Sequence, residues 1–521
     1  MAAFDFPLLS LLIFFPMAAA LGLFMPGFSN WTRPLALAAA VAEFALSILA
    51  LGWFDATAGG MQFVERHRWI DTLNAQYLVG VDGLSLPFLP LTSLLTVAVI
   101  LASWRGVHHL PRLYFALLLA LQGITIGIYC ALDLILFFLF WELTLPPLFF
   151  LISLWGIGPQ RRHAATQYTL FMLAGGAALL FGFILLALNH ARETGQSVPQ
   201  GLSFDFPALL DTPVPPETQS AIFLLLFLGF AIKAPVFPFH VWLPTTAMQG
   251  PAAVGALLTG LKLGLFGIIR FAVPLAPQAA NRHFGLIAVL GVTGAIYGAL
   301  VALRQSNLRR LLAFSSISHV GMVLIGIAAF NIQGIQGAAF QTFNFGLVAG
   351  GLFLLAGFLQ QRLGSTELTS LGGAARPMPL LASLFFILGL AGMGIPGTNG
   401  FAAEHLMLIG AFRSHTGMGV AALIGVVLGA AYFLAFFRQA FLGPVLRKPV
   451  ASACDLLPRE LCVVGGLAAL ALIFGLHPQP MLDLSRKPLQ AWVSRLDAGP
   501  PTSLARHNPS ASTELANATV P

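Results

Sequence analysis

Apolar segments recur along nearly the whole chain and are separated by short polar connections. Each is about 20 residues long, the length that a helix needs to cross about 30 Å of hydrocarbon. The pattern predicts an all-α polytopic membrane protein with about fourteen transmembrane helices. The predicted helices span residues 7–26, 34–54, 82–104, 112–131, 133–157, 164–189, 219–237, 251–274, 284–304, 310–330, 335–359, 378–410, 416–442 and 460–477.

Two of these segments are interrupted by Gly and Pro beside an ionisable residue. The first interruption, at 231–235, contains Lys233, and the second, at 394–400, is followed by Glu404. Unwound backbone at membrane depth is stable only where protein or a water-filled cavity surrounds it. A charge at the bilayer centre costs about 2.5–3.5 kcal/mol on insertion scales and usually marks an ion path. The interruptions therefore predict two broken helices beside such a path.

Composition and charge agree with this class. Hydrophobic residues make up 58% of the chain and charged residues only 9%, which is too little charge for a soluble surface. The net charge of +7 could suggest nucleic acid, but the basic residues fall in alternate loops, which share one side of the membrane. By the positive-inside rule that side is cytoplasmic, so both termini are predicted outside. The loop residues are Arg105, Arg112, Arg161, Arg162, Arg304, Arg309, Arg310, Arg362, Arg376, Arg438, Arg447, Lys448 and Arg459.

The cysteines and the segments between the predicted helices point to no further functional site. Cys130, Cys454 and Cys462 show neither metal spacing nor a paired framework, so redox chemistry within this chain is not expected. The polar loop at 190–218 is interpreted as an ordinary extramembrane loop. The N-terminal stretch lacks a basic region before its apolar run, so it is interpreted as a permanent first helix.

The order of the helices predicts a repeat. Helices four to eight contain one broken helix, and helices nine to thirteen contain the other in the corresponding position. Because five is an odd number, the second unit must enter from the opposite side, which is an inverted-topology repeat. The predicted organisation is N-terminal helices at 1–111, repeats at 112–275 and 276–442, a C-terminal helix with its flanks at 443–498, and a polar tail at 499–521.

Glu142 and Lys233 form the first candidate pair. Burial disfavours a charge, whereas an opposite charge within about 4–6 Å favours it, so the two would stabilise each other's charged forms. If they separate, that stabilisation is lost, which makes proton transfer from Lys233 possible. We therefore predict a switchable pair. The alternative is a static salt bridge that holds the bundle together.

Lys262 lies near the middle of the predicted helix 251–274, about one membrane helix after Lys233. Two lysines in this order suggest consecutive stations of a hydrophilic relay. The alternative is snorkelling, in which a long side chain reaches the membrane interface. Arg270, which is closer to the helix end, is predicted to snorkel.

Glu404 follows the second interruption and is interpreted as the terminal acid, which exchanges protons with water. Its alternative role is to cap the second half-helix. His319 and His240 carry imidazoles suited to proton transfer near neutral pH, although structural histidines are the alternative for both. Asp82 and Ser85 are predicted to cap the third helix.

Several motifs, taken together, resemble a known family. They are VDGLSL at 81–86, FWE at 140–142, IKAP at 232–235, PFHVWLP at 238–244, RLLAFSSISH at 310–319, GIPGT at 394–398 followed by Glu404, and HPQP at 477–480. The set is similar to the antiporter-like membrane subunits M (chain 4) of proton-pumping NADH:quinone oxidoreductase, respiratory complex I. The resemblance runs over almost the whole chain.

The resemblance implies a non-redox translocase subunit of a bacterial inner-membrane enzyme. By motif matching, Glu142 and Lys233 would be the coupling pair, Lys262 the central relay, His319 an intermediate and Glu404 the terminal residue. NADH, FMN, iron–sulfur clusters and quinone would belong to partner subunits, and this chain would bind no cofactor and no metal. Its partners would be the other membrane and peripheral subunits, the lipid bilayer and protons.

Three departures from the family pattern indicate a divergent branch. One is the loop Gln249-Gly250-Pro251, where an acidic or Ala-Pro context is more usual. The segment from Pro251 to Lys262 is about two residues shorter than expected, and two residues rotate a side chain by about 200° on an α-helix. Either a π-bulge or local unwinding compensates, or Lys262 faces elsewhere. In addition, Phe345 stands where the family often has histidine, so a relay there would need Asn344, Gln341 or water.

Alternatives remain open because carboxylates and water can carry either H⁺ or Na⁺. The chain could belong to a multisubunit Na⁺/H⁺ antiporter, a membrane hydrogenase or an inorganic-carbon uptake complex of the same superfamily. It could also be a structural membrane scaffold whose channel has decayed. Neighbouring genes for redox subunits, antiporter subunits or a zinc protein would separate the NADH dehydrogenase, the antiporter or hydrogenase, and the carbon-uptake complex.

Overall fold

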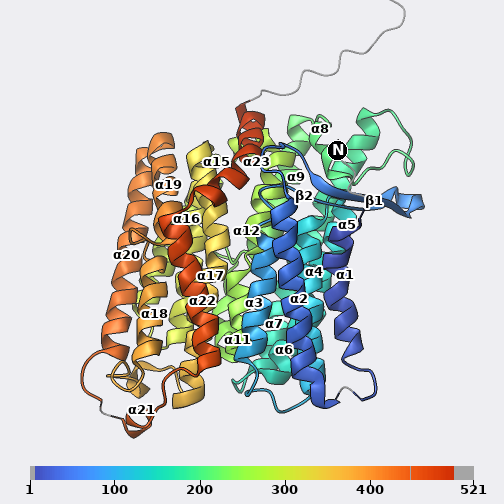
Figure 1. Cartoon of the computed structure of the whole chain (residues 1–521). Coiled ribbons are helices and arrows are strands. Elements are labelled where there is room, and N and C mark those ends of the chain that lie inside the picture. Colours follow the sequence, from blue (N-terminus) through green and yellow to red (C-terminus); the bar gives the residue numbers. More distant parts are fainter. Residues whose placement is uncertain (1–5, 28, 446, 498–521) are drawn as a thin grey trace, which may run out of the picture.

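Helices account for most of the chain and stand side by side in one bundle (Figure 1). The computed structural model describes residues 6–27, 29–445 and 447–497, so the predicted tail at 499–521 lies outside the described residues. Within the described ranges, eleven helices are long and apolar enough to cross a membrane, and three further apolar helices are shorter. The predicted class of polytopic helical membrane protein is confirmed. The number of about fourteen crossings and the inverted repeat stay predictions.

The helices are named in chain order, first those up to residue 275 and then those after it. The first group contains α1 (Leu8–Gly22), α2 (Thr32–Trp53), α3 (Phe88–Ala102), α4 (Pro111–Cys130), α5 (Leu134–Leu143), α6 (Leu145–Trp155), α7 (Arg161–Glu193), α8 (Phe206–Asp211), α9 (Pro216–Lys233), α10 (Trp242–Gln249), α11 (Ala252–Gly260), α12 (Leu263–Gly267) and α13 (Val273–Leu275). The second contains α14 (Pro277–Arg282), α15 (Phe284–Leu303), α16 (Leu308–Ala328), α17 (Ile332–Leu363), α18 (Pro379–Gly392), α19 (Asn399–Ser414), α20 (Thr416–Phe441), α21 (Lys448–Ala451), α22 (Pro458–Leu476) and α23 (Gln479–Asp497).

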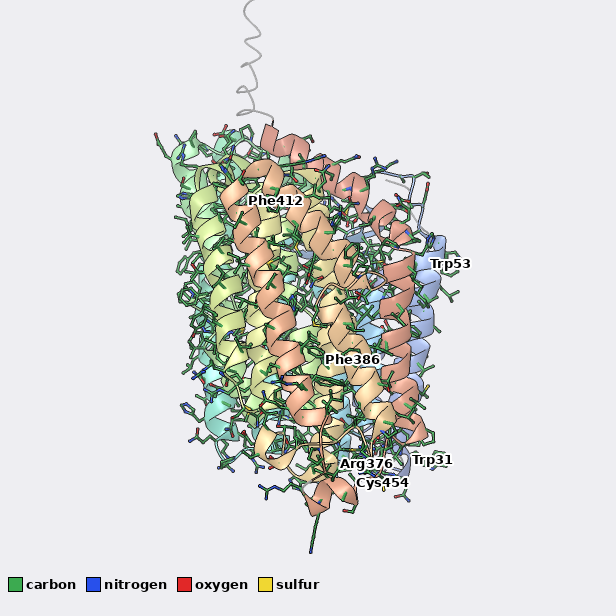
Figure 2. All side chains as sticks on the ribbon, turned by 90° about the vertical axis from the view of Figure 1, so that its left-hand side faces the viewer. Trp31, Trp53, Arg376, Phe386, Phe412 and Cys454 are labelled. Atoms are coloured by element: carbon green, nitrogen blue, oxygen red, sulfur yellow. The ribbon has the colours of Figure 1, made fainter. Side chains whose placement is uncertain are left out.

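The surface of α2 shows where the membrane interfaces lie. Trp31, directly before α2, and Trp53, its last residue, are 63% and 54% exposed and lie at opposite ends of this helix (Figure 2). Tryptophan is enriched at both membrane–water interfaces. The 22 residues of α2 between these ends span about 33 Å at 1.5 Å per residue, which matches the hydrocarbon core.

Both predicted interruptions are present. Helix α9 ends at Lys233 and α10 begins only at Trp242, while α18 ends at Gly392 and α19 begins at Asn399. Proline removes backbone donors in the first gap. In the second gap Gly394 has φ +65°, a left-handed conformation that glycine adopts at little cost.

One end of the bundle carries structure that the hydrophobic pattern did not predict. Strands β1 (Gln62–Ile70) and β2 (Ala75–Val81) form an antiparallel hairpin, and α23 crosses the same end (Figure 1). The polar loop at 190–218 is more ordered than expected, because it contains α8. Arg66 of β1 pairs at 2.7 Å with Asp205, whose carboxylate also caps α8.

The predicted helix 251–274 is not continuous, which corrects that prediction. It unwinds at Leu261 (φ −93°, ψ 95°) and Lys262 (φ −86°, ψ 62°), and Ile268–Ala272 forms a π-helix. Both irregularities change the register of the helix. The unwinding is one of the two kinds of compensation predicted for the shortened segment before Lys262, whereas the π-helix follows Lys262 and changes only the register after it.

Helix α23 completes the hydrogen bonding of this π-helix. The N–H of Val273 bonds the carbonyl of Ile268, so the next donor in the π pattern would be the nitrogen of Pro274. Proline has no N–H, which leaves the carbonyl of Ile269 without that partner. Trp492 of α23 supplies one, because its indole Nε1 donates to Ile269 O at 2.8 Å.

Arg270 does not snorkel, which is a second correction. Its side chain is buried, and Nη1 donates to Asp82 Oδ2 at 2.5 Å. The guanidinium is therefore paired with a carboxylate inside the protein and does not extend to the membrane–water interface. Asp82 also does not cap the third helix, because α3 begins only at Phe88. Its Oδ1 instead accepts from the N–H groups of Leu84 and Ser85, both at 3.1 Å, and closes the preceding turn.

Close packing of α15 on α16 depends on glycine. A Cβ on Gly321 of α16 would meet the backbone of α15 at Ala295 and Gly291. Small residues at such contacts allow membrane helices to approach closely, and dispersion then stabilises the pair.

We expect Gly321→Leu to lower the melting temperature of the purified protein in detergent clearly, because overpacking costs about 1–3 kcal/mol or more. The matched control is Gly465→Leu on α22, where a Cβ would have no heavy atom within 4 Å. Equal melting temperatures for the two variants would contradict the packing role of Gly321.

Candidate functional site

Glu142 lies in the last turn of α5, beside the irregular residue Thr144 that separates α5 from α6. Its side chain is half-buried, and its Oε1 has no hydrogen-bond partner among the described residues. Gly176 of α7 lies directly against this carboxylate, with no space for a Cβ. The glycine therefore provides the room that the acid occupies.

Lys233, the last residue of α9, reaches the same turn. Its Nζ donates to Thr144 Oγ1 at 2.9 Å and to Trp141 O at 3.2 Å, and it lies 3.9 Å from the centroid of a Trp141 ring. These contacts satisfy the ammonium through hydrogen bonds and a cation–π interaction. Lys233 and Glu142 are close enough for their charges to interact. They form no ion pair among the pairs found in the described chain.

A cavity of about 40 Å³ adjoins Lys233, and we call it the Lys233 cavity. Its lining includes Thr144, Tyr168 and Lys233 together with Leu261 and Leu263, which flank Lys262 in the sequence. A buried water needs a space of about 10–15 Å³ and two to four polar partners. The Lys233 cavity thus has room for water between Lys233 and the unwound segment that carries Lys262.

Lys262 points into the protein. Its side chain is 2% exposed, Nζ donates to Ser316 Oγ of α16 at 2.7 Å, and the Phe345 ring centroid lies 5.0 Å away. The unwinding at Leu261 and Lys262 places the lysine at the junction of α11 and α12, facing α16 and α17. The snorkelling alternative does not describe this position.

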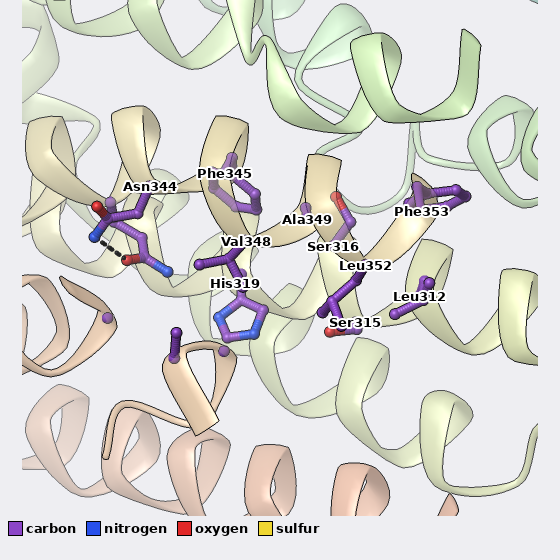
Figure 3. A pocket seen from close by; sticks show the side chains of 14 residues that line it. Leu312, Ser315, Ser316, His319, Asn344, Phe345, Val348, Ala349, Leu352 and Phe353 are labelled. Atoms are coloured by element: carbon purple, nitrogen blue, oxygen red, sulfur yellow. Dashed lines mark hydrogen bonds between the residues drawn. The ribbon is translucent and has the colours of Figure 1, made fainter. Parts of the chain in front are cut away.

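A second cavity of about 40 Å³, which we call the His319 cavity, lies beyond Ser316 (Figure 3). His319 and Ser316 of α16 line it together with Asn344 and Phe345 of α17. The rings of Phe345 and His319 meet edge to face at 6.2 Å. Phe345 therefore fills the space between Lys262 and His319 with an apolar ring.

A polar contact joins α17 to the second broken helix. Asn344 donates to Asn399 O at 3.0 Å and accepts from Asn399 Nδ2 at 2.8 Å. It also donates to Gln341 Oε1 at 3.2 Å. Asn344 and Gln341 both line the His319 cavity, which is where the sequence suggested that polar groups replace a histidine.

Glu404 lies beyond the first turn of α19, so it does not cap that helix. Its carboxylate is buried against Gly394, and its Oε1 lies 3.6 Å from His319 Nδ1. That separation suits an electrostatic contact but is too long for a hydrogen bond. Tyr432 of α20 lies on the other side of the ring, 3.4 Å from His319 Nε2, and also bonds Ser315 at 2.7 Å.

The structure thus brings the predicted residues into three clusters. These are Glu142 with Lys233, Lys262 with Ser316, and His319 with Glu404. His240 does not join them: its ring packs among Phe237, Tyr297 and Phe314, away from the lining of both cavities.

Sequence reasoning missed the hydroxyl and amide partners Thr144, Ser316, Tyr432 and Asn399. Their types are common in membrane helices, so nothing in the sequence alone marked them. In the described part of the chain, no group of three His, Cys, Asp or Glu side chains could hold a metal ion.

Residues 131–429 match the family described as NADH:quinone oxidoreductase/Mrp antiporter, transmembrane. The chain is 35% identical to NADH-quinone oxidoreductase subunit M of Rhodobacter capsulatus over 92% of its own length and 94% of the relative. It is 34% identical to F(420)H(2) dehydrogenase subunit M of Methanosarcina mazei over 94% and 98%. A chain of respiratory complex I from Thermus thermophilus with bound NADH is similar with a TM-score of 0.84 and 31% identity, over 94% of this chain and 100% of that one.

Proposed function

Because this chain belongs to the NADH:quinone oxidoreductase/Mrp antiporter transmembrane family, we propose that it is the proton-translocating subunit M of an NADH:quinone oxidoreductase. It is a multi-pass membrane subunit of a larger complex. Electron transfer in partner subunits, which would hold NADH, FMN, iron–sulfur clusters and quinone, would drive protons through this chain. The chain itself would bind none of these groups.

One observation carries the proposal: two water-sized cavities alternate with the three clusters of buried polar and charged groups. The path would run from Glu142 and Lys233 through the Lys233 cavity to Lys262 and Ser316. From there it would continue through the His319 cavity to His319 and Glu404. Water held in each cavity would carry the proton across the gap that the cavity adjoins. A change in the Glu142–Lys233 separation would change how firmly Lys233 holds its proton, which supplies the coupling.

The two ends of the bundle would have different roles. Arg376 and Cys454 lie at one end, and the hairpin and α23 at the other (Figures 1 and 2). By the distribution of basic loops, we assign the Arg376 end to the cytoplasm. The units at 112–275 and 276–442 would form the inverted repeat, with the breaks at Lys233 and before Glu404 in equivalent places.

We expect Glu142→Gln and Lys233→Ala each to lower coupled proton translocation about a hundredfold, within the range that proton-transfer groups contribute. The measurement is the initial rate of acidification in vesicles containing the reconstituted complex. Matched controls are Glu193→Gln and Lys448→Ala, because both side chains are exposed. Unchanged translocation in both test variants would support the scaffold alternative and reject the proposal.

Gene neighbourhood tests the assignment to a particular complex. The F(420)H(2) dehydrogenase subunit is almost as similar as the NADH-quinone oxidoreductase subunit, at 34% against 35% identity, so similarity alone does not select the electron donor. We expect genes for NADH-oxidising and quinone-site subunits beside this one. Antiporter genes or a zinc protein gene there would indicate the alternative complexes.

A further inference from the structure

Tyr168 of α7 carries a buried hydroxyl that the proposed proton path does not use. Its side chain is 1% exposed, and its Oη has no hydrogen-bond partner among the described residues. A buried hydroxyl without a partner is unfavourable, because burial removes its hydrogen bonds to water and nothing replaces them. Such a group therefore calls for a partner that the protein atoms do not provide.

Tyr168 lies beside both the Glu142–Lys233 pair and the cavity through which the proton would leave Lys233. Tyr168 lines the Lys233 cavity together with Lys233, Thr144 and Leu261. Glu142 lies close enough for its charge to act on the tyrosine hydroxyl. Tyr168 is thus the residue of α7 that adjoins the coupling pair and the gap before Lys262.

The ring of Tyr168 is held in place by the first broken helix. It meets Trp242 of α10 edge to face at 5.3 Å, and Trp242 Nε1 donates to Ile232 O at 2.9 Å, one residue before Lys233. The tyrosine is therefore fixed relative to Lys233 through its ring. Removal of the hydroxyl alone would leave this packing unchanged.

We propose that Tyr168 is a positioning residue whose hydroxyl holds a water molecule in the Lys233 cavity, and that this water carries the proton from Lys233 towards Lys262. The inference rests on the proposed function. Three polar groups, Tyr168 Oη, Thr144 Oγ1 and Lys233 Nζ, give such a water the two to four partners that a buried water needs.

The test is Tyr168→Phe in the reconstituted complex, with Tyr129→Phe as the matched control. Tyr129 is also 1% exposed, and its hydroxyl likewise has no hydrogen-bond partner in the described part of the chain, but neither the Lys233 cavity nor the His319 cavity includes it in its lining. We expect Tyr168→Phe to slow proton translocation about three- to tenfold, the effect of one lost hydrogen bond. The solvent deuterium isotope effect on that rate should also rise, because proton transfer then limits turnover. Tyr129→Phe should change neither quantity.

The outcomes separate the inference from the proposed function. If Lys233→Ala abolishes translocation while Tyr168→Phe matches the unmodified complex, the role of Tyr168 is rejected and the proposed function stands. Equal losses in both tyrosine variants without a change in isotope effect would show a packing effect and also reject that role. If Lys233→Ala has no effect, the proposed function and this inference fail together.

Discussion

Lys262→Met is expected to stop coupled proton translocation by this subunit, with a fall of about a hundredfold or more. Lys262 stands between the two cavities, where its ammonium bonds Ser316. Methionine has a similar length and suits a buried site, but it carries no proton. The loss of translocation should therefore come from the missing proton carrier and not from a change in packing. The measurement is the rate of acidification by the reconstituted complex, together with its NADH:quinone activity in the presence of an uncoupler, which should persist.

The control for Lys262→Met uses one of the other three lysines in the sequence. Lys448, at the start of α21, is exposed and far along the chain from both cavities, so Lys448→Met should leave translocation unchanged. Ser316→Ala tests the position of the ammonium and should produce a smaller loss. If Lys262→Met pumps at the normal rate, the path does not pass through Lys262.

The two broken helices beside Lys233 and Glu404 could be predicted because their causes are local. Pro235 and Gly394 act within their own turns, and no distant residue is needed to interrupt the helix. The break at Lys262 has a different cause. Gly264 packs directly on the backbone of α9, and Gly260 lies near Gly346 of α17. Those contacts exist only in the folded bundle, so the hydrophobic pattern predicted a continuous helix, and only the shortened segment relative to the family pattern suggested unwinding or a π-bulge.

The candidate site was predicted in part for the same reason. Charged residues are rare in lipid, which made Glu142, Lys262 and Glu404 visible in the sequence. Their neutral partners were not visible, because Ser316 is 54 residues from Lys262 and Thr144 is 89 residues from Lys233. The chemistry of the site depends on both kinds of group, and the second kind is selected by tertiary contact.

Arg270 shows how a distant partner reverses a prediction. Its position near a helix end suggested snorkelling, yet Asp82, 188 residues earlier, meets it in the interior. The π-helix around Arg270 also depends on a distant residue, because the indole of Trp492 in α23 donates to its carbonyl at Ile269. This partner was not predicted from the sequence, because the indole that supplies the missing donor lies more than 200 residues after the π-helix.

Arg270→Met is expected to destabilise the protein strongly, by about 3–5 kcal/mol, because it breaks a buried ion pair by removing one partner. Both side chains of the Arg270–Asp82 pair are 7% exposed, so the variant leaves a buried carboxylate without its cation. Its two backbone hydrogen bonds, from Leu84 and Ser85, offset only part of that cost. The melting temperature and the yield of folded protein in detergent measure the loss.

Two further variants show whether the uncompensated charge causes this loss. In the double variant Asp82→Asn with Arg270→Met no charge remains, so most of the stability should return. Arg495→Met is the exposed counterpart, because Arg495 and Asp211 are 38% and 81% exposed and lie 3.3 Å apart. Surface pairs contribute about 0–1 kcal/mol, so that variant should melt almost normally. A double variant no more stable than Arg270→Met alone would mean that the arginine stabilises the π-helix by packing, through Phe206 and Met61, and not by charge.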